Sequence, residues 1–219
     1  MAYGSPRPDA EQPRRVPKRG PGKCSTVVCN HTGFIEILNL VCSPLQPGFV
    51  SKDEVSRMPI AAGLTTGLQS IYISRAADEA SKKATIKTIT DRASAIEDDC
   101  EPWSPFMVFP EGSTSNGSHL LKFKRGAFEA MRTVRPCYFK ISDRMFWPGW
   151  DVIEFWPLFI LVASSLCCYT CTIYMMPEFT PNEKMLEMHA DKGSEDWEIF
   201  AECVREAMAK QSGYPISNQ

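Results

Sequence analysis

The stretch VVCNHTGFIEIL, residues 27–38, joins a short β-branched run to an apolar run with helical spacing through an Asn-His-Thr-Gly break. The first run predicts a buried strand, and the second predicts the first turns of a helix. His31 then stands at a strand-to-helix corner, and a carboxylate, Glu36, follows five positions later. In α/β sheets, functional side chains collect where strands end and loops begin. The corner is either a catalytic base with its orienting acid or an ordinary strand end.

The segments around this corner repeat the alternation of strand and helix. Strands are predicted within LQSIYISR (68–75), PFMVFPEGS (105–113) and VRPCYFKI (134–141). Residues 79–96 have apolar side chains at helical spacing, and SEDWEIFAECVREAMAK (194–210) predicts a closing surface helix. This alternation predicts an α/β domain with a mostly parallel central sheet flanked by helices.

Length and composition indicate a single folded domain. The chain has 219 residues, of which 43% are hydrophobic, and this is short for two cores. We expect the domain to span residues 24–212, between a disordered, basic, proline-rich tail at 1–23 and a short tail at 213–219. The net charge of −2 gives no overall basic field, so nucleic acid is not an expected partner. Nine irregularly spaced cysteines without a cleavable signal peptide predict reduced thiols.

The segment 155–177 has no charged residue, which raises the question of a membrane contact. Its wholly apolar part would form a helix of about 23 Å, shorter than a hydrocarbon core of about 30 Å, and Pro157 interrupts its start. CTIYMM (171–176) at its end favours a strand. Two interpretations stay open: a helix that contacts or dips into one leaflet, and a fully buried core helix.

Four stretches, NHTGFIE, IYISR, FPEGSTSNG and VRP, stand in an order and at intervals that resemble the PlsC-type glycerolipid acyltransferases. The likeness is closest to the acyltransferases that act on lysophosphatidylcholine or lysophosphatidylethanolamine, and it runs from about Ser25 to Met208. It implies the glycerolipid acyltransferase fold and transfer of a fatty acyl group from acyl-CoA to the free hydroxyl of a lysophospholipid. It implies no cofactor besides acyl-CoA as co-substrate, and no metal.

The resemblance assigns the corner to catalysis. His31 would be the general base, and Glu36, which stands where the family usually has aspartate, would orient it. An imidazole titrates near neutral pH and can take the proton of an alcohol, which is otherwise a poor nucleophile. A carboxylate that accepts the other ring N–H fixes the tautomer and stabilises the imidazolium. No serine nucleophile is needed, because the lipid hydroxyl takes that part.

The other blocks imply the substrate contacts. Arg75 would bind the acceptor phosphate, as a planar and permanently charged group can. Glu111, Gly112 and Ser113 would help to hold the glycerol-phosphate portion, and loop N–H groups there suit an oxyanion. Lys124 belongs to a basic stretch that would either meet CoA phosphates or lipid headgroups or form a solvated face. Block four would contribute Val134 and Pro136, which would shape the acyl-donor side of the site.

The resemblance also implies a location and leaves alternatives. Expected partners are acyl-CoA, a lysophospholipid and a membrane surface, with the site near the cytosolic face of the endoplasmic reticulum. The alternative is a catalytically inactive relative that binds lysolipid or CoA, or a truncated form without its membrane anchor. A zinc site at Cys24, Cys29 and His31 is disfavoured because there is no C-x2-C pair, and a serine hydrolase because there is no G-x-S-x-G elbow.

Overall fold

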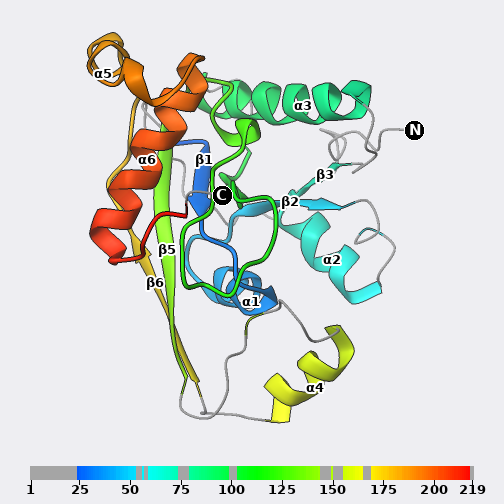
Figure 1. Cartoon of the computed structure of the whole chain (residues 1–219). Coiled ribbons are helices and arrows are strands. Elements are labelled where there is room, and N and C mark those ends of the chain that lie inside the picture. Colours follow the sequence, from blue (N-terminus) through cyan, green and yellow to red (C-terminus); the bar gives the residue numbers. More distant parts are fainter. Residues whose placement is uncertain are drawn as a thin grey trace.

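A computed structural model describes residues 24–52, 56, 59–73, 79–98, 103–143, 149, 155–164 and 169–217 (Figure 1). The basic tail at 1–23 and Arg75 lie outside the described residues. In chain order the elements are β1 (Thr26–Cys29), α1 (Phe34–Cys42), β2 (Gly48–Lys52), α2 (Pro59–Gly67), β3 (Ile71–Ile73), α3 (Glu79–Glu97), β4 (Phe106–Val108), η2 (Arg125–Ala127), β5 (Val134–Asp143), α4 (Phe155–Ser164), β6 (Tyr169–Met175), α5 (Glu183–Met188), η3 (Ala190–Lys192) and α6 (Asp196–Ser212).

The strands form one six-stranded sheet in the order β3-β2-β4-β1-β5-β6. All neighbouring pairs are parallel except β5 and β6, which are antiparallel. The mostly parallel α/β sheet predicted from the sequence is therefore confirmed. In this order the short strand β1 lies between β4 and β5, so the loops that follow β1 and β4 leave the sheet side by side.

Alternate side chains of β1 enter two different cores. Val28 faces the core formed with α3 and α6, to which the helices contribute Ile89, Ala93, Phe200 and Val204. Val27 and Cys29 face the opposite core, which includes Leu40 of α1. A strand that is buried on both faces needs a continuous apolar run, which is what the sequence at 27–29 provides.

The predicted strands and helices are present, whereas β2, α2, α5 and the 3-10 helices η2 and η3 were not predicted. β2 and α2 lie between residues 48 and 67, where glycines and prolines weaken the local pattern. Gly48 begins β2 beside the turn that follows α2, and a Cβ there would lie 2.8 Å from the carbonyl oxygen of Leu68. The glycine is thus needed for a close approach of two backbone segments, a tertiary requirement that the sequence does not reveal.

The apolar segment forms the ten-residue helix α4, which Figure 1 shows apart from the sheet and below α1. Trp156 and Ile160 are 64% and 65% exposed, so the interpretation as a fully buried core helix is wrong. Among the side chains of this helix that the structure describes, Leu158 alone is a buried hydrophobic residue. In the described part of the chain, no helix is long and apolar enough to cross a bilayer.

Candidate active site

His31 lies just beyond the carboxyl end of β1, and Glu36 lies in the first turn of α1. The His31 Nδ1 atom is 2.8 Å from Glu36 Oε2. The carboxylate of Glu36 is fully buried, whereas about a fifth of the His31 side chain is exposed. With Nδ1–H donating to Glu36, the lone pair of the neutral ring is on Nε2. The arrangement is that of a base whose tautomer and orientation are fixed by a buried acid.

Thr32 holds the second oxygen of the same carboxylate. Its backbone N–H donates to Glu36 Oε1 at 2.6 Å, and its hydroxyl Oγ1 also donates to that oxygen. Glu36 is the third residue of α1, a position where a glutamate can reach back over the helix start and where the helix dipole favours negative charge. Both carboxylate oxygens therefore have partners.

The loop after β4 packs directly against His31. The ring of Phe109 stacks on the imidazole with a centroid separation of 4.0 Å and an interplanar angle of 17°. Ser115 N–H donates to the His31 carbonyl oxygen at 2.9 Å. The block containing Phe109 and the block containing His31 are adjacent because β1 and β4 pair in parallel, with Val28 opposite Val108. The structure thus brings together two of the sequence blocks that the resemblance assigned to one site.

Glu111 is only 2% exposed and is surrounded differently from Glu36. Among the described residues, neither of its carboxylate oxygens completes a hydrogen bond. Burial raises the pKa of Glu111 to about 8, although the backbone N–H groups of His31 and Leu121 act in the opposite direction. Glu111 therefore carries its proton through much of the neutral range.

Gly112 and Lys124 form the rim of the same loop. Gly112 has a φ angle of +71°, in the left-handed region that favours glycine. The side chain of Lys124 crosses directly over it, so that a Cβ at position 112 would lie 2.5 Å from Lys124 Nζ. Lys124 N–H also donates to the Pro110 carbonyl oxygen at 2.8 Å. Ser113 is exposed next to this glycine.

The basic residues Lys122, Lys124 and Arg125 lie in two different environments. Lys122 lies 3.8 Å from Glu198, and Arg125 forms a short ion pair with Glu129 at 2.6 Å. Both are thus engaged at the surface of α6 and η2, in agreement with the solvated-face interpretation. Lys124 alone of the three lies over the glycine of block three.

Several supporting residues were not predicted from the sequence. Thr32, Phe109 and Ser115 are adjacent to predicted residues, but their contacts with Glu36 or His31 depend on tertiary register. Asn30 is also buried, and its Oδ1 atom accepts the Phe139 backbone N–H at 2.9 Å, which ties the end of β1 to β5. In the sequence, the only sign of these contacts was that polar residues stand at positions 30 and 32, on either side of His31.

The thiol nearest to His31 in the chain is not a nucleophile. Burial, together with the adjacent thiol of Cys137, raises the pKa of Cys29 well above its usual value. Among the described residues, Cys29, Cys42, Cys137, Cys171 and Cys203 have free thiols. No group of three or more His, Cys, Asp or Glu side chains among the described residues could hold a metal ion.

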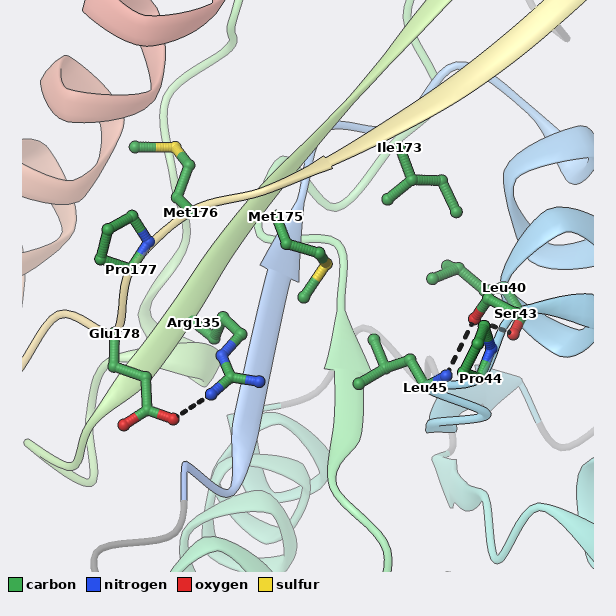
Figure 2. A pocket seen from close by; sticks show the side chains of 10 residues that line it. All are labelled: Leu40, Ser43, Pro44, Leu45, Arg135, Ile173, Met175, Met176, Pro177 and Glu178. Atoms are coloured by element: carbon green, nitrogen blue, oxygen red, sulfur yellow. Dashed lines mark hydrogen bonds and ion pairs between the residues drawn. The ribbon is translucent and has the colours of Figure 1, made fainter.

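A cavity of about 600 Å³ lies elsewhere, at the opposite end of α1 (Figure 2). Its lining is mostly apolar and includes Leu40 near the end of α1, Leu45 just after that helix and Met175 of β6. The ion pair of Arg135 with Glu178 lies at one side. Because β5 begins next to Arg135, this cavity is near the amino ends of the parallel strands. His31 is beyond their carboxyl ends, and no predicted site residue lines the cavity.

Comparisons with known proteins identify related sequences. The acyltransferase family model matches residues 9–144. A lysophosphatidylcholine acyltransferase of Drosophila melanogaster is 31% identical over 197 residues, which is 88% of this chain and 34% of that protein. The lysophospholipid acyltransferase LPEAT1 of Arabidopsis thaliana is 27% identical over 90% of this chain and 47% of its own length. The chain thus spans between a third and a half of these curated relatives.

One solved structure has a similar fold. The crystal structure of the 1-acyl-sn-glycerophosphate acyltransferase PlsC from Thermotoga maritima superposes with a TM-score of 0.50. The match covers 93% of this chain and 71% of that one, at 15% sequence identity. It supports the same sheet architecture with flanking helices.

Proposed function

Because the chain belongs to the acyltransferase family, we propose that it transfers a fatty acyl group from acyl-CoA to the free hydroxyl of a lysophospholipid. The similarity to the Drosophila lysophosphatidylcholine acyltransferase and the Arabidopsis lysophospholipid acyltransferase supports this substrate class. The observation that carries the proposal is the 2.8 Å contact of His31 Nδ1 with the buried Glu36. This pair is a general base that needs no nucleophile from the protein.

In the proposed reaction, the lipid hydroxyl attacks the thioester carbonyl carbon while His31 Nε2 takes its proton. Glu36 stabilises the imidazolium that forms. The tetrahedral intermediate then breaks its C–S bond, and the imidazolium returns the proton to the departing thiolate. CoA leaves as a thiol, the new ester retains the hydroxyl oxygen, and the protein is unchanged. A protonated Glu111 would add no second negative charge beside a developing oxyanion.

The remaining substrate contacts are proposals as well. Gly112, Ser113 and Lys124 border the loop that follows Phe109, where a phosphorylated acceptor would find backbone N–H groups and an ammonium group. Arg75 stays a prediction for the acceptor phosphate. A location at the endoplasmic reticulum, with the site near the cytosolic face, also stays a prediction, and imaging of the tagged chain would test it.

The test is release of CoA from an acyl-CoA in detergent micelles, with a panel of lysophospholipids as acceptors. Release should require a lysolipid and should fall about 10²- to 10⁴-fold in His31→Ala. His189→Ala is the matched control, because His189 caps α5 and is not part of the proposed site. If folded wild-type protein releases no CoA with any acceptor, the inactive lysolipid- or CoA-binding relative is favoured instead.

A further inference from the structure

Helix α4 exposes apolar side chains around most of its circumference. Trp156, Phe159, Ile160 and Leu161 are between 39% and 65% exposed. At about 100° per residue, these four side chains lie within an arc of roughly 200° of the helix surface. A groove on another protein covers a single face of a helix, whereas a hydrocarbon environment covers a wide arc. The exposed arc therefore fits lipid.

In the described residues, Leu158 and Phe159 contact the domain beside the proposed base. Leu158 is fully buried in a small cluster with Phe34 and Ile35. The rings of Phe34 and Phe159 are 6.0 Å apart. Phe34 and Ile35 form the first turn of α1, between His31 and Glu36 in the chain. The apolar surface of α4 is thus continuous with the end of α1 that carries the catalytic pair.

The dimensions and charge of the segment fit one leaflet. Ten helical residues extend about 15 Å, roughly half of a hydrocarbon core. No charged residue occurs from position 155 to 177, so no ionised side chain in the segment opposes transfer from water. We propose that α4 inserts into the surface of a phospholipid bilayer and thereby holds the His31 end of the domain against the leaflet from which an amphiphilic acceptor would come.

Flotation of the full chain with phosphatidylcholine vesicles tests this contact. The assay contains no acyl donor and no acceptor, so its result does not depend on the proposed reaction. Wild-type protein should bind, and binding should persist in about 0.5 M NaCl, because salt screens a basic tail but not an apolar contact. Ile160→Gln with Leu161→Gln should lower the apparent partition coefficient at least about tenfold.

The control exchanges equally exposed apolar residues on other helices. Leu64→Gln with Met188→Gln replaces side chains that are 45% and 66% exposed on α2 and α5, and it should change binding less than about twofold. The single variant Ile160→Gln should show an intermediate loss, and far-UV circular dichroism checks that each variant is folded. Equal binding of the α4 double variant and wild type would overturn the proposal. So would a wild-type dimer that binds no vesicles and dissociates in the α4 variant, since a second copy would then cover the helix.

Discussion

The two glutamates at the carboxyl ends of β1 and β4 are both buried, yet their surroundings differ. Glu36 accepts hydrogen bonds from His31 and from both the N–H and the hydroxyl of Thr32. Glu111 has no completed hydrogen bond among the described residues, and burial raises its pKa to about 8. Hydrogen-bond donors favour the ionised form of a buried acid, whereas burial with incomplete hydrogen bonds favours the protonated form. The same residue type thus has two different environments in one candidate site.

Among the changes that test the difference between the two glutamates, Glu36→Gln should have the largest effect on activity. Glutamine keeps the shape but not the charge, so it can neither stabilise the imidazolium nor accept on both oxygens. We expect kcat for CoA release to fall about 10³-fold, with little change in KM. Glu183→Gln, at an exposed position in α5, is the control. A loss below about tenfold would show that Glu36 has a structural and not a catalytic role.

Glu111→Gln should instead change the pH dependence of stability. Folding raises the pKa of Glu111 from 4.5 to about 8, so the native state binds the proton more tightly than the unfolded state. Its contribution is therefore complete below pH 4.5 and is lost as pH rises to about 8. Relative to wild type, the glutamine variant should gain up to about 1.4 kcal/mol of unfolding free energy per pH unit across this window. Urea unfolding at several pH values measures it, and a constant difference would contradict the raised pKa.

Thr32→Val tests whether the Thr32 hydroxyl holds the Glu36 carboxylate in place, and its expected effect on activity is smaller. The valine removes the hydroxyl donor and leaves the backbone N–H in place. We expect a loss of about 1 to 3 kcal/mol in unfolding free energy and a five- to twentyfold lower kcat. Thr32→Ser keeps a hydroxyl and should recover most of the activity. If serine and valine behave alike, the hydroxyl does not position the carboxylate.

Gly112→Ala, next to Glu111 in the chain, should have the smallest effect of these changes. An alanine at φ +71° costs about 1 kcal/mol, and its Cβ displaces the flexible end of Lys124. Urea unfolding measures this cost. If the Lys124 ammonium contacts the acceptor, KM for the lysolipid should rise severalfold while kcat changes little. An unchanged KM, together with an unchanged KM in Lys124→Ala, would remove Lys124 from the proposed site.

Much of the fold was predictable because it is encoded locally. The β-branched run before His31 and the helical spacing after it define β1 and α1, and α3 and α6 follow from their apolar periodicity. The interval from His31 to Glu36 spans one corner and is visible in the sequence, but only the family resemblance assigned this pair to catalysis. The order of the four blocks pointed to the acyltransferase family, and the PlsC structure has a similar fold.

The parts of the fold and the site that were not predicted depend on contacts between distant segments. Phe109 stacks on His31 only because β1 and β4 pair in one register, which no local pattern specifies. The hydrogen bonds from Thr32 to Glu36 form because the Glu36 side chain turns back over the start of α1. The exposure of α4 was equally open, because an apolar sequence is the same whether protein or lipid surrounds it.

The strand β6 has a consequence for handling the protein. It lies at the end of the sheet, and in the described part of the chain no strand pairs with its outer edge. Its sequence, YTCTIYM, has no charged residue. An uncharged edge strand offers free backbone donors and acceptors to a second chain, which is the first step of edge-to-edge aggregation. Concentrated preparations therefore contain a template for self-association, and the exposed Thr170 and Thr172 are the positions where a lysine would act as a gatekeeper.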